Sequence, residues 1–282
     1  MNFVLTSLLS AGLPALFAGV LWFLGGRFHR AHLWLSAVAV GGGMMLAYYL
    51  ALGKPAFPTT DAQEWVFWYA LGLIPLGWLM GIAAPYRWIA GWGLVLALPW
   101  LFVWLFVPLM RSEYWSLTVG MTWILVFGVG LAAMALGVAS AEARLTGWQM
   151  AFLLALVGGV SAGMMFYGAK SSSFAQLAGA LGLVVGIAVP VGWGMRSFRV
   201  GQGAVAMLVV LYGILWAIGF AYGQLQAPYL AVFALCMLAI ALGARGASGW
   251  RFVVPLLLIL LIGGGAVGMS YQTYMSASTG YE

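Results

Sequence analysis

Few side chains in this 282-residue sequence could carry out acid–base, nucleophilic or metal chemistry. It has five acidic residues, two histidines and one cysteine, against eleven Lys and Arg. His29 and His32 are three residues apart, beside Arg27 and Arg30. That spacing permits a metal site. We instead favour an interfacial polar cluster that touches lipid phosphates, because basic groups gather at anionic membrane surfaces.

Three of the acidic residues, Asp61, Glu64 and Glu113, carry the oxygen ligands that Ca²⁺ and Mg²⁺ prefer. They fall in polar segments between apolar runs, as do Lys54 and Arg111. We interpret them as solvated loop carboxylates that pair with those basic residues. A weak cation site on one face of the protein is the alternative.

No nucleophile and no haem ligand pair is predicted. Ser171–Ser173 has no histidine near it in the sequence, and the cluster is typical of a turn followed by a helix N-cap. Cys236 lies inside an apolar run, where a free cysteine usually acts as a small buried hydrophobic residue. The two histidines share one short segment, so they cannot face each other from two helices. We therefore expect no enzyme, no bound metal and no cofactor.

The composition is that of an integral membrane protein. The chain is 65% hydrophobic and 6% charged, with a mean hydropathy of +1.07, whereas soluble domains average about 25% charged residues. We predict an all-α, polytopic bundle of about ten transmembrane helices with short loops, because ten apolar runs approach the roughly 20 residues that span a bilayer. They are Val4–Leu24, Leu33–Leu52, Trp65–Ala84, Trp88–Leu109, Trp115–Val138, Trp148–Tyr167, Phe174–Trp193, Ala204–Tyr222, Tyr229–Leu242 and Trp250–Tyr271.

The charges in the connections predict how these runs are oriented across the membrane. The odd-numbered connections carry most of the basic residues, and only Lys54, Arg111 and Lys170 fall in even-numbered ones. The positive-inside rule then places the odd connections in the cytoplasm and both termini on the non-cytoplasmic side. We expect one transmembrane domain over residues 1–282, in the plasma (inner) membrane of a bacterium, with the lipid bilayer as partner. The basic residues form no run or stripe, which argues against nucleic acid.

Arg and Trp recur together at the odd-numbered connections. In each copy a basic residue precedes a Trp by a few positions, just before an apolar run. Both residue types favour membrane interfaces, so we interpret the copies as cytoplasmic anchors. The predicted anchors are Arg30, Arg87, Trp92, Arg144, Trp148, Arg245 and Trp250.

Glycine is abundant, with 40 copies. Spacings such as Gly264-x-x-x-Gly268 place small residues on one helix face, which predicts close helix packing. The alternative is that some glycine- and proline-rich helices unwind and expose carbonyls to a cavity. The residues expected at a cavity or a broken helix are Gly41, Gly42, Gly43, Ser161, Gln176, Pro190, Gly192 and Gly264.

Some fragments recur four helices apart, such as Gly43–Met45 and Gly163–Met165. Duplication of a four-helix unit, over about residues 31–140 and 148–244, is one interpretation, and it would give parallel repeats. Coincidence in a chain rich in Gly, Met and Trp is the interpretation we favour.

Two functions fit this pattern. Every charged residue falls in a loop or at a helix end, whereas an intramembrane charge usually marks a proton relay or ion coupling. We expect a permease for a neutral or amphiphilic small molecule; the alternative is a non-catalytic structural subunit of a larger membrane complex, packed against partner helices or lipid. A permease should bring the polar residues of the helices to one cavity, and a structural subunit should scatter them. Those residues are Thr118, Thr122, Gln149, Ser161 and Gln176.

Overall fold

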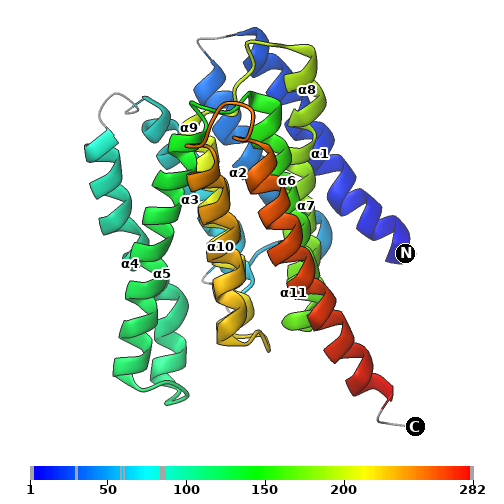
Figure 1. Cartoon of the computed structure of the whole chain (residues 1–282). Coiled ribbons are helices and arrows are strands. Elements are labelled where there is room, and N and C mark those ends of the chain that lie inside the picture. Colours follow the sequence, from blue (N-terminus) through cyan, green and yellow to red (C-terminus); the bar gives the residue numbers. More distant parts are fainter. Residues whose placement is uncertain (1–2, 29–30, 58, 60, 83–86, 280–282) are drawn as a thin grey trace.

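The chain forms a bundle of helices (Figure 1). The computed structural model describes residues 3–28, 31–57, 59, 61–82 and 87–279, and this part contains no β-strand. Within it, nine helical segments are long and apolar enough to cross a membrane, by length and composition. A tenth apolar helix, α10, has 17 residues. The predicted all-α class is confirmed.

Each predicted apolar run coincides with one helix or with two consecutive helical pieces. The sixth run is α6 followed by the π-helical turn η2, and the seventh is α7 followed by α8. The bounds are α1 (Phe3–Arg27), α2 (His32–Leu52), α3 (Glu64–Ile82), α4 (Arg87–Arg111), α5 (Leu117–Ala141), α6 (Gly147–Gly163), η2 (Met164–Gly168), α7 (Ser172–Gly186), α8 (Ala188–Gly194), α9 (Gln202–Ala221), α10 (Ala227–Gly243) and α11 (Val253–Thr279).

The connections alternate between two ends of the bundle. We call one the Arg-rich end, at the top of Figure 1, and it holds the connections 142–146, 195–201 and 244–252. The other, the opposite end, holds 112–116, 169–171 and 222–226. The basic residues divide between the two ends as the loop-charge pattern predicts. In the connections just named, Arg144, Arg196, Arg199, Arg245 and Arg251 lie at the Arg-rich end and Lys170 at the opposite end.

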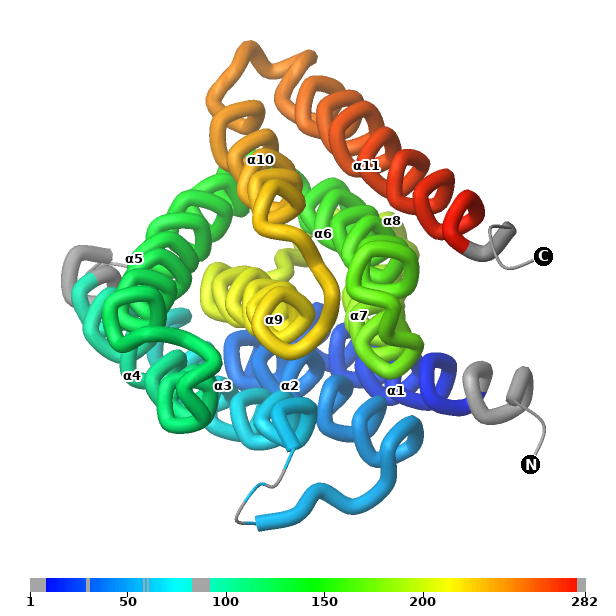
Figure 2. The backbone as a smooth tube through the Cα atoms, turned by 90° about the horizontal axis from the view of Figure 1, so that it is seen from below, coloured from blue at the N-terminus to red at the C-terminus, as the bar shows by residue number. Residues whose placement is uncertain are grey.

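Helix α9 is the core of the bundle. It lies inside a ring formed by α2, α3, α5, α6, α7 and α10 (Figure 2). Over the apolar stretch of α9 that is long enough to cross a membrane, 94% of the residues are buried. The mean hydropathy of this stretch, 2.3, is the highest among the described helices of that length. A helix that is apolar on every side is expected in such a position.

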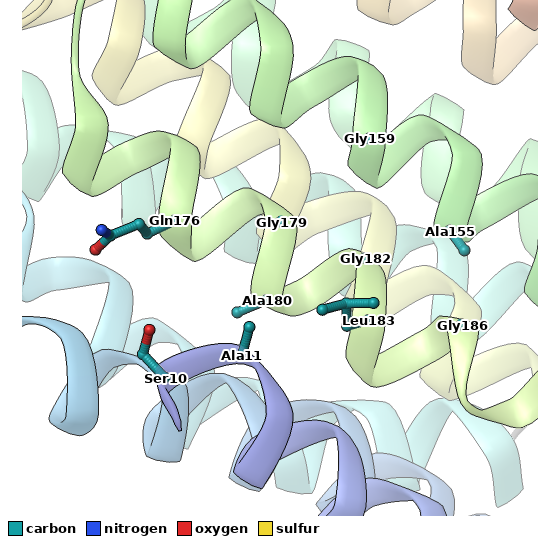
Figure 3. A pocket seen from close by; sticks show the side chains of 10 residues that line it. All are labelled: Ser10, Ala11, Ala155, Gly159, Gln176, Gly179, Ala180, Gly182, Leu183 and Gly186. Atoms are coloured by element: carbon teal, nitrogen blue, oxygen red, sulfur yellow. The ribbon is translucent and has the colours of Figure 1, made fainter. Parts of the chain in front are cut away.

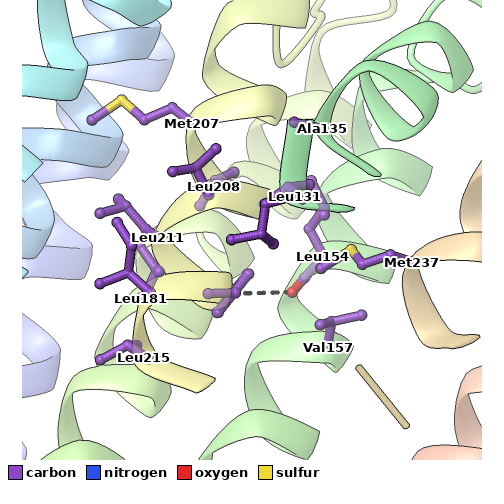
Figure 4. Packing of buried hydrophobic residues seen from close by; sticks show 14 of the residues in the cluster. Leu131, Ala135, Leu154, Val157, Leu181, Met207, Leu208, Leu211, Leu215 and Met237 are labelled. Carbon is purple, nitrogen blue, oxygen red and sulfur yellow. Dashed lines mark hydrogen bonds between the residues drawn. The ribbon is translucent and has the colours of Figure 1, made fainter. Parts of the chain in front are cut away.

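Glycines allow the helices around α9 to approach closely. A Cβ atom on Gly203 of α9 would lie 1.8 Å from the carbonyl oxygen of Gly77 in α3. One on Gly158 of α6 would lie 2.5 Å from the Cα of Gly182 in α7. Large aliphatic side chains fill the remaining space around α9 (Figure 4), where the Tyr212 hydroxyl donates to a carbonyl of α6. Backbone proximity of this kind drives helix association where lipid supplies no hydrophobic force.

Helix breaks at the glycine clusters were the alternative to close packing, and the described helices are not broken there. Helix α2 is continuous through Gly41–Gly43, and α11 is continuous through Gly264. In α2 the missing side chains make room for neighbours: a Cβ on Gly41 would lie 2.3 Å from Ile74, and one on Gly43 would lie 2.8 Å from Val184. These glycines are therefore packing positions, while nothing lies within 4 Å of a Cβ on Gly264.

The interruption that does occur lies near Pro190, at Ile187 between α7 and α8. Proline has no N–H, so it cannot bond to the carbonyl four residues earlier, that of Gly186. The helical hydrogen-bond ladder is therefore incomplete at this position. A second irregularity, η2, ends α6 at the other end of the same helix pair.

Candidate functional site

A groove between α1, α6 and α7 contains one of the predicted polar residues, Gln176 (Figure 3). Its volume is about 480 Å³. Gln176 and Ser10 provide its polar groups, and small residues, including Gly159 and Gly182, line the rest. An amide and a hydroxyl beside an apolar floor can hydrogen-bond a neutral polar group while an apolar part of the same molecule lies along the helices.

The other predicted polar residues lie elsewhere. Ser161 is buried in the core, where its hydroxyl accepts a 2.9 Å hydrogen bond from the indole N–H of Trp216. Gln149 caps the start of α6 by accepting from the main-chain N–H of Thr146 at 3.0 Å. Thr118 and Thr122 are exposed on α5, where the Thr122 hydroxyl donates to the main-chain carbonyl oxygen of Thr118. The five polar residues are therefore scattered over the bundle.

The strongest polar network lies at the Arg-rich end. The Arg199 guanidinium donates to the carbonyl oxygen of Glu142 at 3.1 Å and to that of Leu145. The Glu142 carboxylate accepts from the main-chain N–H of Gly201 at 3.4 Å. The Nε2 atom of His32 lies 2.5 Å from the carbonyl oxygen of Arg199. The network thus joins the start of α2, the end of α5 and the start of α9.

Glu142 is almost fully covered, with 7% of its surface exposed. This burial raises the pKa of the Glu142 carboxyl, because removal from water disfavours the charged form. The charge of Arg199, the hydrogen bond from Gly201 and the charge of His32 each oppose the shift, in that order of size. The net effect is a carboxyl group that binds a proton more readily than an exposed one.

Phe198 anchors the connection that carries Arg199. Its buried ring packs edge-on against Trp22, with the ring centres 5.9 Å apart, and against His32 at 6.4 Å. A Cβ on Gly147 would lie 2.4 Å from the carbonyl oxygen of Phe198, and one on Gly192 would lie 2.9 Å from its ring. The glycines of α6 and α8 thus let the connection lie directly on the helices.

The chain matches no known protein family, no curated protein and no solved structure.

Glu142 and Arg199 were not among the residues that the sequence singled out for a site. The available signal was charge: Glu142 is the one acidic residue in the Arg-rich connections. His32 was expected at lipid phosphates, but it hydrogen-bonds the protein main chain. His29 and Arg30 lie outside the described residues.

The remaining predicted positions are distributed along the bundle, and Gly192 among them is buried. Pro190 lies in a shallow apolar groove between α1 and α8, with a volume of about 340 Å³. Gly192 packs against the main chain of Trp148, whose ring stacks on Trp193 at 5.6 Å. The predicted anchors with exposed side chains at the Arg-rich end are Trp92, Arg144, Arg245 and Trp250. The Arg87 side chain lies outside the described part.

The acidic residues considered as a cation site do not form one cluster. Glu64 accepts from the main-chain N–H of Asp61 at 3.2 Å, and Asp61 accepts from the side chain of Gln63 at 2.8 Å, just before α3. Glu113 lies in the connection after α4. Among the described residues, no three His, Cys, Asp or Glu side chains come together as metal ligands.

Proposed function

We propose that this chain is a non-catalytic, multi-pass membrane subunit that packs against partner helices or lipid. The placement of the polar side chains supports this proposal over the permease. Of the five polar residues predicted to line a cavity, only Gln176 lies in the groove. Ser161 and Gln149 form hydrogen bonds elsewhere in the bundle, and Thr118 and Thr122 are exposed on α5. A structural subunit needs such residues only to stabilise its own fold.

The outer face of α4 supports the same proposal. Trp92, Leu96, Trp100 and Trp104 follow one another at four-residue spacing, and each is 62–69% exposed. Residues four apart share one helix face. In a membrane this face meets hydrocarbon over about 18 Å, at 1.5 Å per residue. Indole N–H donors favour an acceptor once water is excluded, and a neighbouring protein helix can supply one.

The outer face of α11 carries glycines and leucines where that of α4 carries large aromatic side chains. A Cβ on Gly264, Gly265 or Gly268 would have nothing within 4 Å, and Leu257 and Leu261 are exposed on the same helix. Small residues on an open face allow a partner helix to approach closely. We propose a bacterial plasma (inner) membrane as the location, with the Arg-rich end in the cytoplasm, because that end carries most of the basic loop residues.

The test is whether the tagged protein, purified from its native membrane in a mild detergent, carries stoichiometric partners. We expect partner chains whose recovery falls when Trp100 and Trp104 are changed to Ala, or when Gly264 and Gly268 are changed to Leu. Gly72→Leu is the matched control, because a Cβ there also has nothing within 4 Å but lies on α3. A solitary particle, unchanged by these variants, would contradict the proposal.

The permease remains a second candidate because of one observation. The groove that holds Gln176 is lined by α6 and α7, and the membrane-length segments of both are irregular, at η2 and at Ile187. Interrupted helices surround the substrate sites of many transporters. Comparing metabolite uptake into cells that carry the wild type, Gln176→Leu or Gly72→Leu tests this candidate. Uptake that only Gln176→Leu abolishes would favour it, and uptake equal to that of cells lacking the protein would reject it.

A further inference from the structure

We propose that the segment Arg199–Gly201, here called the strap, is a pH-dependent cover over Glu142: neutral Glu142 keeps it closed, and ionised Glu142 favours its opening to water. This device is independent of any partner or substrate. It rests on the contacts between the end of α5 and the start of α9.

All three residues of the strap are attached to the rest of the bundle. Arg199 donates to carbonyl oxygens after α5, Val200 is fully buried, and the Gly201 N–H donates to the Glu142 carboxylate. His32 contacts the carbonyl oxygen of Arg199 from α2. Lifting the strap would therefore expose Val200 and bring water to the carboxylate of Glu142.

The segments on both sides of the strap are packed against the bundle. Before the strap, the Phe198 ring is buried among Trp22, His32 and glycines, and after it, α9 is enclosed by its neighbours. Gly201, with φ +88° and ψ 132°, lies at the joint between strap and helix. A glycine can change its backbone angles there at little cost.

The charge balance at Glu142 is incomplete in the closed form. The described contacts of the Arg199 guanidinium go to main-chain oxygens, and the carboxylate receives one N–H at 3.4 Å. The charged groups that act on Glu142 are Arg199 from the strap and His32 from α2. Arg144, on the same connection as Glu142, and Arg196, next to the strap, are exposed to solvent. A buried carboxylate without a close ion pair is costly in its charged form.

The direction of the pH effect follows from linkage. Burial raises the pKa of Glu142 when the strap is closed, and hydration returns it toward the usual value when the strap is open. The closed form therefore binds the proton more tightly. Raising the pH therefore favours the open form between two limits, the ordinary carboxyl pKa of 4.5 and the raised pKa of Glu142 in the closed form. Above the raised pKa the balance between the two forms no longer changes with pH.

Cysteine labelling of the purified full chain can measure the opening. In a Cys236→Ala background, Val200→Cys places a thiol where the strap is buried, and Ser197→Cys places one on the same connection where the chain is exposed. Dividing the maleimide labelling rate of Val200→Cys by that of Ser197→Cys cancels the intrinsic pH dependence of thiol reactivity. We expect this ratio to rise with pH by up to about tenfold per pH unit and then level off.

Variants of the two charged residues make the test specific. Glu142→Gln should give a low ratio that does not change with pH, whereas Glu113→Gln, a carboxyl change at the opposite end, should keep the wild-type profile. Arg199→Gln removes a contact that holds the strap, so the labelling ratio should be higher at every pH. It also removes the charge that opposes the rise in the pKa of Glu142, so the ratio should become constant at a higher pH than in the wild type.

Two outcomes would overturn the proposal. One is a Val200→Cys to Ser197→Cys ratio that stays constant with pH when Glu142 is intact, a result that does not depend on the folding of any Glu142 variant. The other is a folded Glu142→Gln protein that retains the full rise.

Discussion

Glu142 and Arg199 each hydrogen-bond the main chain at the end of the helix that the other residue adjoins. Arg199, just before α9, donates its guanidinium N–H to carbonyl oxygens beyond the end of α5, and Glu142, just after α5, accepts from the N-cap residue of α9. Both helix ends lie at the Arg-rich end of the bundle, and α5 and α9 are neighbours. The Arg199 cation thus meets a helix C-terminus, where the helix dipole favours it. Glu142 meets a helix N-terminus, where the dipole favours the charged carboxylate, but burial outweighs this and favours the neutral acid.

Glu142→Gln should change how thermal stability depends on pH. The raised pKa means that Glu142 contributes stability at pH values below its unfolded pKa, and that this contribution is lost as the pH rises through the folded pKa. Across that window the wild type should lose up to about 1.4 kcal/mol per pH unit relative to Glu142→Gln. Melting in detergent at a series of pH values measures the difference. Parallel curves for the two proteins would show that Glu142 keeps an ordinary pKa.

Gly201→Ala should destabilise the start of α9. At φ +88° and ψ 132° a side chain is strained, and a Cβ would also lie 3.4 Å from the His32 ring. We expect a loss of about 1–3 kcal/mol. Gly194→Ala is the control, because a Cβ at Gly194 has nothing within 4 Å. Equal melting temperatures for the two variants would mean that Gly201 can adopt another conformation.

Alanine should be tolerated unequally at the two glycines, Gly77 and Gly203, that bring α3 and α9 together. A Cβ on Gly203 would lie 1.8 Å from the Gly77 carbonyl oxygen, but one on Gly77 would lie 3.4 Å from the Gly203 carbonyl oxygen. Gly203→Ala should therefore separate the two helices and cost about 1–3 kcal/mol or more, while Gly77→Ala should cost much less. Thermal melting of the two variants in the same detergent gives the comparison. A larger loss for Gly77→Ala would contradict this packing.

Ser161→Ala and Ser36→Ala should differ although both serines are buried. Ser161 accepts from the Trp216 indole, so its loss leaves a buried donor unpaired, at a cost of about 1–3 kcal/mol. The Ser36 hydroxyl has no partner among the described residues, so removing it should be nearly neutral or slightly stabilising. The measurement is again the melting temperature, and similar losses for both would refute the distinction.

Ala143→Cys and Lys170→Cys should label from opposite sides of the membrane. The first lies in a connection at the Arg-rich end and the second in one at the opposite end. In a Cys236→Ala background, an impermeant maleimide applied to intact cells should reach only Lys170→Cys, because the positive-inside rule places the Arg-rich end in the cytoplasm. Labelling of both from the same side would exclude this orientation.

Hydrophobic length made the helices predictable, because a run of apolar residues of bilayer length forms a helix whatever its neighbours are. Helix interruptions were harder to predict. Of the three consecutive glycines, Gly41 packs against α3 and α9, Gly42 against α1 and Gly43 against α7. The break occurs instead at Ile187, three residues before Pro190, which was one of the residues expected at a broken helix. A glycine allows either outcome, and only the neighbouring helices decide which one occurs.

The candidate site was less predictable than the fold. Gln176 was expected at a cavity and lies in a groove, but the network of Glu142, Arg199 and His32 joins residues far apart in the sequence. No spacing rule connects them. Their proximity depends on how three connections come together at one end of the bundle.

The enclosure of α9 has a consequence for biogenesis. During synthesis, α2, α3, α5, α6 and α7 emerge before α9, and α10 emerges after it. If the helices assemble in this order, α9, the most hydrophobic of the described membrane-length helices, packs against five helices that are already present, and α10 then covers the side that is still open. A nascent chain that stops before Ala227 would leave α9 uncovered on the side that α10 occupies in the finished protein.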